Sequence, residues 1–136
     1  MDISIPVSGY RFNVRVAVLI DTPAGFIFEK DDKEGFYFPV GGRVKIGELS
    51  VEAAKREVFE ELGIRLPALH QVKTSEYFFD YDGEAFHEIC FFYHAELNHI
   101  ELSDDFISIP QSRLEDYDLR PEEVKKLIVE KELICD

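Results

Sequence analysis

The segment GGRVKIGELSVEAAKREVFEELGI, residues Gly41–Ile64, joins a pair of glycines to an amphipathic pattern rich in glutamate. Apolar residues recur along it at helical spacing and form one stripe, made by Val51, Ala54, Val58 and Leu62. Ser50 is suited to cap the start of this helix, and Gly63 to end it. The segment therefore predicts a helix over residues 51–62 between two loops.

Three glutamates gather beside the apolar stripe rather than opposite it. Glu57, Glu60 and Glu61 share one face at spacings of three and four residues, where like charges repel by roughly 0.2–0.5 kcal/mol per pair. Partial burial at the edge of a core increases that repulsion. Hard divalent cations prefer carboxylate oxygens, so a bound metal ion would relieve it. From these residues alone, an acidic and solvated helix face remains the alternative.

The remaining chain predicts strands around this helix. Period-two patterns and turn residues indicate a buried strand over Phe12–Asp21, a turn at Thr22–Gly25 and a partner strand over residues 26–30. A further strand is expected over residues 36–46, with a turn at its two glycines. A hairpin across Asp82-Gly83 and a short strand over Phe106–Ile109 follow. A closing helix follows over residues 120–133, with Pro121 in its first turn. About six strands and two helices in mixed order give the class α+β, a mixed β-sheet sandwiched between helices.

Composition and charge restrict the function. The 136 residues suit one domain, residues 1–136, and 15 Lys and Arg oppose 28 Asp and Glu, a net charge of −13. Such a surface repels nucleic-acid polymers and anionic membranes. No apolar run is long enough to span a bilayer, and the N-terminus does not resemble a signal peptide. Two cysteines without metal or redox spacing make a disulfide framework unexpected, so we expect a cytoplasmic protein.

The helix and its flanks resemble the signature box of the Nudix (MutT-type) hydrolases over residues 42–64. The box is matched at every fixed position, by Gly42, Glu48, Arg56, Glu57, Glu60, Glu61 and Gly63, with Val58 and Ile64 at its aliphatic positions. Seven fixed residues coincide by chance on the order of once in 10⁸ windows. The resemblance implies a mixed sheet between helices, with the box as a loop–helix–loop motif. It also implies Mg²⁺- or Mn²⁺-dependent hydrolysis of a pyrophosphate bond in a nucleoside triphosphate, nucleotide sugar or dinucleoside polyphosphate.

The resemblance also implies roles for residues of the box. The metal ligands would be Glu57, Glu60, Glu61 and the carbonyl of Gly41. Arg56 would orient a carboxylate by ion pairing, and Glu48 would support the loop or a metal-bound water. The family often has proline immediately before the two glycines, where this chain has Val40. This departure affects the expected rigidity of the turn and leaves the box intact.

Residues outside the box supply further candidates. The general base would be a box glutamate or one of the acids Glu88, Glu101, Asp104 and Asp105. Phosphate or ribose contacts would come from Arg11, Arg15, Arg43 and Lys45, each of which could equally be an exposed strand residue. Tyr81 lies seventeen residues past Ile64, where dinucleoside polyphosphate hydrolases of the family tend to carry tyrosine. The aromatic residues around Tyr81 could stack on a nucleobase or simply pack a hairpin.

Two other functions compete with hydrolysis. A catalytically silent Nudix-like domain would bind a nucleotide as a sensor, but silent versions are expected to lose box carboxylates, and this chain keeps them all. An unrelated acidic interaction domain would not explain the box. The expected partner is a small nucleotide, and assembly as a homodimer stays open.

Overall fold

The elements of the fold follow the predicted order, with two additions. The structure is a computed structural model that describes residues 1–129. Its elements are β1 (Ser4–Val7), β2 (Tyr10–Thr22), β3 (Gly25–Lys30), β4 (Tyr37–Arg43), α1 (Ser50–Leu62), β5 (His70–Tyr81), β6 (Glu84–Glu96), β7 (Phe106–Ile109), a 3-10 helix η1 (Gln111–Asp116) and α2 (Glu123–Val129). Strand β1 and helix η1 were not predicted. The rest of the predicted closing helix, residues 130–133, lies outside the described residues.

Strand β2 is the centre of a seven-stranded mixed sheet with the order β5-β6-β2-β4-β3-β7, and β1 also pairs with β2. It runs parallel to β6 from Arg11, opposite Phe86, to Asp21, opposite Glu96. It runs antiparallel to β4, and β5 runs antiparallel to β6. One parallel pair within an otherwise antiparallel sheet needs a long crossover, and helix α1 lies within that connection.

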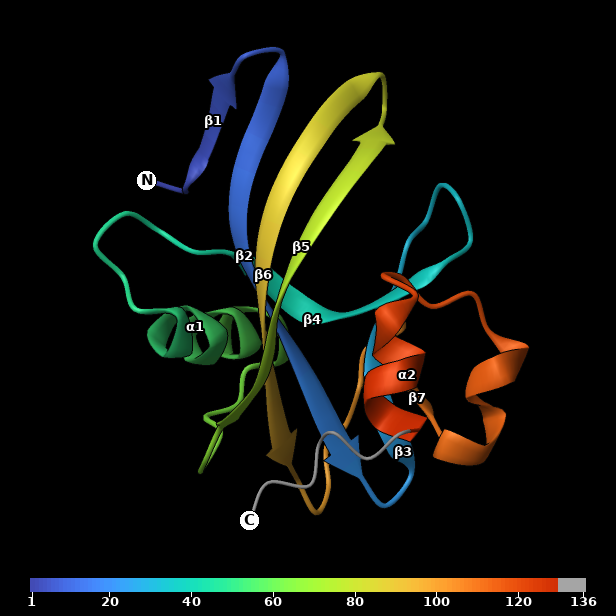
Figure 1. The fold of residues 1–136 in the computed structure, drawn as a ribbon. Coiled ribbons are helices and arrows are strands. Elements are labelled where there is room, and N and C mark those ends of the chain that lie inside the picture. The colour runs from blue at the N-terminus through green and yellow to red at the C-terminus, as the bar shows by residue number, and fades with distance from the viewer. Residues whose placement is uncertain (130–136) are drawn as a thin grey trace.

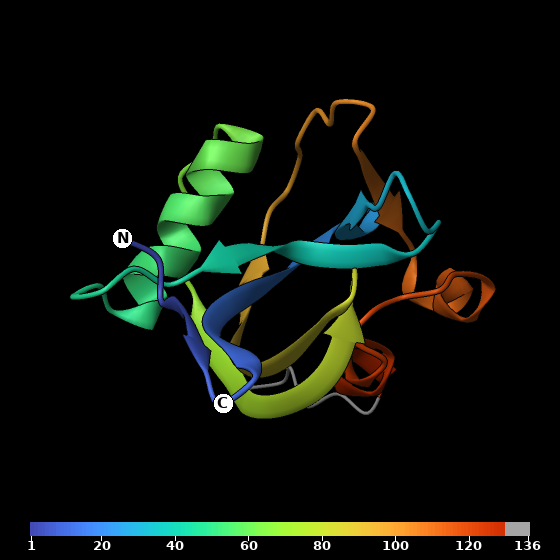
Figure 2. The same cartoon turned by 90° about the horizontal axis from the view of Figure 1, so that it is seen from above.

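Helices cover both faces of this sheet, as Figures 1 and 2 show from two directions. Even-numbered residues of β2, such as Val16 and Val18, share a buried cluster with Val58 of α1. The odd-numbered residues Ala17 and Leu19 lie in a second cluster, which includes apolar side chains of η1 and α2. Because the side chains of a strand alternate between faces, one buried strand feeds both cores. The predicted α+β class, a mixed sheet between helices, is confirmed.

Three local predictions were wrong. The two glycines do not turn, because Gly41 and Gly42 continue β4 and pair with β2. The N-cap of α1 is Leu49, whose N–H donates to Glu52 at 3.2 Å, whereas Ser50 is already helical and its hydroxyl shares a 2.6 Å hydrogen bond with Tyr93. Helix α2 begins at Glu123, so Pro121 precedes it.

Two sequence expectations concern membranes and cysteines. Within residues 1–129, no helix has the length and apolar character needed to cross a bilayer. Cys90 is a buried free thiol, and burial raises its pKa to about 12. Cys135 lies outside the described residues.

Candidate active site

The guanidinium group of Arg56 is the centre of the signature box. Its Nε and Nη2 donate to the two carboxylate oxygens of Glu48 at 2.8 and 3.0 Å. Its Nη1 donates to Glu57 at 2.8 Å and to Glu60 at 3.2 Å, and Nη2 also donates to the carbonyl of Arg43 at 3.0 Å. A guanidinium group has five N–H donors, and these five hydrogen bonds use all of them. Arg56 thereby fixes three carboxylates relative to the end of β4.

Glu48 connects this centre to the loop that precedes α1. Its Oε1 accepts a hydrogen bond from the backbone N–H of Lys45 at 3.0 Å in addition to the bond from Arg56. The hydrogen bonds from Arg56 lower the pKa of Glu48, so its carboxylate is held in the charged form. The loop and the helix are therefore tied together through one ion pair.

The paired glycines make room for this arrangement. A Cβ atom on Gly42 would lie 2.3 Å from the carboxyl carbon of Glu57, which is closer than van der Waals contact allows. A Cβ atom on Gly41 would lie 2.1 Å from the backbone oxygen of Val16 on the neighbouring strand. Gly42 therefore provides space for a carboxylate, whereas Gly41 provides space for the sheet itself.

Glu61 is a carboxylate of α1 whose pKa is strongly raised. Burial, followed by the neighbouring charges of Glu29 and Glu57, raises the pKa of Glu61 to about 8. Burial also raises the pKa of Glu57 and of Glu29, a residue of β3 that was not predicted to belong to the site. The Oε2 atom of Glu61 is buried and has no hydrogen-bond partner among residues 1–129. The charge of Arg15 offsets only part of the rise in the pKa of Glu61, so a buried acceptor without a donor lies among other carboxylates.

These carboxylates fit a divalent cation in their chemistry, although they are not gathered around one point. Within the described residues, no three Asp, Glu, His or Cys side chains are close enough to hold a metal ion. Glu57 and Glu60 are drawn toward Arg56, and the side chain of Glu60 is 52% exposed. The unpartnered oxygen of Glu61 and the space beside Gly42 are the features that suit a cation near Glu57.

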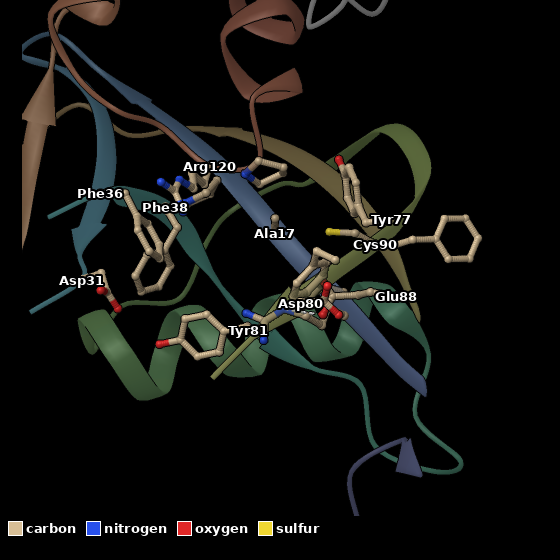
Figure 3. Close-up of a pocket in the computed structure, with 16 residues that line it drawn as sticks. Ala17, Asp31, Phe36, Phe38, Tyr77, Asp80, Tyr81, Glu88, Cys90 and Arg120 are labelled. Carbon is tan, nitrogen blue, oxygen red and sulfur yellow. Dashed lines mark ion pairs between the residues drawn. The ribbon is translucent and has the colours of Figure 1, made fainter. Parts of the chain in front are cut away.

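A pocket of about 480 Å³ opens on the sheet beside this cluster. Figure 3 shows Phe36, Phe38 and Asp31 on one side and Tyr77, Cys90 and Glu88 on the other, with Ala17 between them. The lining comes from β2, the loop between β3 and β4, β4 itself, β5, β6 and the segment before α2. Its residues are Arg15, Val16, Ala17, Asp31, Phe36, Phe38, Pro39, Tyr77, Phe78, Phe79, Asp80, Tyr81, Glu88, Cys90, Arg120 and Pro121. Six of these sixteen residues are aromatic, and apolar and aromatic linings are typical of ligand pockets.

Arg15 lies between the pocket and the glutamate cluster. Its Nε is 3.6 Å from Oε1 of Glu88 in the pocket lining. Its positive charge also lowers the pKa of both Glu57 and Glu61, against the effect of burial. One guanidinium group therefore interacts with both parts of the site.

The other predicted substrate-binding residues do not all lie in the pocket. Tyr81 lines the pocket, whereas Arg43 contributes its backbone carbonyl to Arg56 and Lys45 its backbone N–H to Glu48. Arg11 pairs with Glu84 at 2.9 Å.

The loop acids that were candidates for the general base, Glu101, Asp104 and Asp105, are exposed. The charge of Asp105 raises the pKa of Glu29, which places Asp105 in the electrostatic field of the cluster.

Three contributors to the site were missed from the sequence. Glu29 is the penultimate residue of the apolar strand β3 and shares a face with the buried Ile27, and this alternation was the available signal. Phe36 and Arg120 form a stacked pair with 4.5 Å between the guanidinium carbon and the ring centroid. They lie more than eighty positions apart in the chain, so spacing could not have joined them.

The fold and the site together define an α/β/α protein with a glutamate cluster ordered by one arginine. The family model described as "NUDIX domain" matches residues 11–132, and the chain belongs to this family. A curated relative from Francisella philomiragia, an RNA pyrophosphohydrolase, is 33% identical over 75 residues. The match covers 55% of this chain and 48% of that relative, so the chain spans about half the length of the curated relatives it matches.

Solved structures share the fold at low sequence identity. A mutator MutT protein from Bacillus halodurans superposes with a TM-score of 0.73 at 14% identity, covering 86% of this chain and 82% of that chain. The Ap4A hydrolase of C. elegans superposes with a TM-score of 0.65 at 16% identity, covering 90% of this chain and 97% of that chain. These likenesses establish the fold alone.

Proposed function

We propose that the protein is a divalent-metal-dependent hydrolase that cleaves the pyrophosphate bond of a nucleoside diphosphate derivative. The observation that carries the proposal is the hydrogen-bonding of Arg56 to Glu48, Glu57 and Glu60, beside the unpartnered oxygen of Glu61. Every carboxylate of the box is retained, and a silent nucleotide sensor would have no need to retain them all. A sensor domain remains the second candidate because the pocket could bind a nucleotide without cleaving it.

In this proposal the box residues hold one or more Mg²⁺ or Mn²⁺ ions. Glu57, Glu60 and Glu61 supply carboxylate oxygens, and Gly41 supplies its carbonyl. When bound, the cation lowers the pKa of a water molecule and neutralises phosphate charge. Arg56 keeps the carboxylates oriented, and Glu48 keeps Arg56 in place.

Side chains of the protein then assist the in-line attack of water on phosphorus. A carboxylate of the cluster accepts the proton that water loses as its oxygen bonds to phosphorus. The bridging P–O bond breaks, and the two products are a nucleoside phosphate and the second group with the remaining phosphate or pyrophosphate. Arg15, between the pocket and the cluster, binds a phosphate oxygen. Tyr81 and the other aromatic side chains enclose the nucleoside.

The proposed substrate is a small nucleotide. The curated relatives are named RNA pyrophosphohydrolases, and their substrates share the pyrophosphate linkage. A net charge of −13 disfavours a polyanionic chain, so nucleoside triphosphates, nucleotide sugars and dinucleoside polyphosphates come first.

A panel assay tests the function directly. These three compound classes, together with a 5′-triphosphorylated RNA oligonucleotide, are incubated with the protein and Mg²⁺ or Mn²⁺, and product release is measured. We expect turnover of at least one small nucleotide and its abolition by EDTA. Binding without turnover across the panel would support the sensor, and turnover that survives EDTA would contradict the proposed chemistry.

Metal binding should stabilise the fold, and Gly42→Ala should remove this effect. A ligand at about 100 times its Kd adds about 2.7 kcal/mol, which corresponds to a rise in Tm of roughly 5–10 °C for a chain of this size. In Gly42→Ala, the added methyl group displaces Glu57, so we expect a folded protein whose Tm hardly responds to metal. Thermal melts in EDTA and in excess Mg²⁺ or Mn²⁺ measure both effects.

Gly41→Ala is the matched comparison for that experiment. Its methyl group would meet the backbone of Val16, which cannot move without opening the sheet. We therefore expect a lower Tm with and without metal. An undiminished metal response in Gly42→Ala would contradict a cation site at Glu57.

A further inference from the structure

Glu88 is a carboxylate whose burial is poorly compensated. It lies on β6 directly opposite Asn13 of β2, in the pocket lining, and its side chain is only 12% exposed. Its two partners within residues 1–129 are distant: Nδ2 of Asn13 at 3.5 Å and Nε of Arg15 at 3.6 Å. Normal charge-assisted hydrogen bonds to a carboxylate measure about 2.7–2.9 Å. Burial accordingly raises the pKa of Glu88.

The hydrogen-bonding capacity of the Glu88 carboxylate is only partly used. Both long contacts involve Oε1 of Glu88, so its carboxylate retains capacity to accept further hydrogen bonds. Asn13 is 2% exposed, and its Oδ1 has no partner among residues 1–129. Asn13 does not line the pocket, but Glu88 does. Buried polar groups are normally hydrogen-bonded, so the free acceptor capacity of Glu88 in the pocket wall indicates a ligand that brings donors.

The pocket specifies the shape of that ligand. Phe36 and Phe38 lie on the side opposite Tyr77 and Glu88 (Figure 3), so a flat ring bound between them would be bordered by aromatic side chains and by this carboxylate. The pocket also contains Asp31 and Asp80, so its acidic groups outnumber Arg15 and Arg120. This balance favours a neutral, donor-rich ring over an anionic group at this end of the substrate.

We propose that Glu88 is the residue that determines base specificity, and that its carboxylate accepts hydrogen bonds from the amino edge of a guanine base. Guanine offers a ring N–H beside an exocyclic amino group, and these two donors match the two oxygens of one carboxylate. Uracil offers a single N–H between two carbonyl oxygens, which the carboxylate repels. The inference rests on the proposed function, since the base belongs to the nucleotide whose pyrophosphate is cleaved, and it gives Glu88 a role other than general base.

Product binding tests the assignment without requiring turnover. Isothermal titration of the whole protein with GMP, IMP, CMP, AMP and UMP compares bases that differ in their donors, and IMP lacks only the 2-amino group of GMP. We expect GMP to bind roughly tenfold to a hundredfold more tightly than IMP and UMP, the effect of one good bidentate pair. Equal affinities for GMP and IMP, or no binding of any monophosphate, would overturn the proposal.

The variant Glu88→Gln completes the test, with Glu84→Gln as its control. Glu84 lies on the same face of the same strand, pairs with Arg11 and does not line the pocket. Glu88→Gln should bring the ratio of GMP to IMP affinities, and of GTP to ITP kcat/KM, close to one, whereas Glu84→Gln should preserve both ratios. An equal loss of kcat on GTP and ITP with an unchanged ratio would assign Glu88 to the chemistry or to Arg15 and overturn the proposal.

The outcomes also separate this inference from the proposed function. If no nucleotide is hydrolysed but GMP is still preferred over IMP, the hydrolase proposal fails and the specificity proposal stands. If GTP, ITP and UTP are hydrolysed with equal kcat/KM, the hydrolase proposal stands and the role of Glu88 in specificity fails.

Discussion

Glu57→Gln, Glu60→Gln and Glu61→Gln are each expected to lower kcat by roughly 10²–10⁴-fold, the range for groups that act on the transition state. Glutamine keeps the size of the side chain and removes its charge, so a divalent cation loses part of its binding energy. Turnover of the best panel substrate at saturating Mg²⁺ measures the effect, and thermal melts establish that each variant folds.

Glu52→Gln is the control on the same helix. Glu52 is exposed, and its carboxylate accepts the N–H of Leu49 at the start of α1. Glutamine keeps an acceptor at that position, so the cap survives and activity should equal that of the parent. Comparable losses in all four variants would indicate a general electrostatic effect and contradict the assignment of Glu57, Glu60 and Glu61 as ligands.

Glu61→Gln should raise the stability of the metal-free protein although it lowers the activity. Its pKa of about 8 in the folded protein exceeds the ordinary value of 4.5, so the folded state holds a proton that the unfolded state has lost. The free energy of unfolding of the metal-free protein therefore falls as the pH rises from 4.5 to 8. Glu61→Gln removes this ionisation, so its Tm in EDTA at pH 8 should exceed that of the parent. A carboxylate that destabilises the empty site and supports turnover is consistent with a cation ligand.

The predictions of helices and strands were correct where a pattern of neighbouring residues determines the local structure. The alternation in β2 and the stripe of α1 depend on which residues are apolar, and both elements formed as expected. The turn predicted at the two glycines was wrong, because a tight turn is only one of the structural features that require glycine. Here the cause is close approach by Val16 and by the carboxylate of Glu57, fifteen residues after Gly42. Neither contact leaves a local signal in the sequence.

The same limit applies to the site. The pair formed by Arg56 and Glu60 could be predicted because residues four apart on a helix are neighbours. The bidentate pair with Glu48 depends on how the preceding loop folds back, and the pocket depends on β5 meeting the segment before α2. Glu29 lies near the glutamates of α1 because β3 pairs with β4 in the sheet. The box therefore predicted which carboxylates gather around Arg56, whereas the residues that line the pocket could be found only from the tertiary structure.

Arg56→Lys is expected to lower kcat by roughly 10–100-fold, the usual effect of losing a group that orients metal ligands. Lysine has three donors on one nitrogen, so it cannot reproduce five hydrogen bonds in a planar fork. Arg56→Ala should lose more activity, because Glu48, Glu57 and Glu60 then repel one another without a shared partner. Both variants should remain folded, since Arg56 lies at the rim of the core. Turnover and Mg²⁺ titration at matched pH measure the two effects.

The alternative is that Arg56 forms ordinary surface ion pairs, which are worth about 0–1 kcal/mol and would not affect catalysis. Its side chain is 21% exposed, and its partners Glu48 and Glu57 are 16% and 15% exposed, so these pairs are largely shielded from water. Arg65→Lys is the control, because Arg65 lies just past the same helix and stacks on Phe59, and no ion pair within residues 1–129 joins it to a box carboxylate. If Arg56→Lys and Arg65→Lys both match the parent in kcat, Arg56 does not orient the glutamates. A selective loss in Arg56→Lys, with Mg²⁺ affinity largely kept, would mean that the direction of its hydrogen bonds matters beyond its charge.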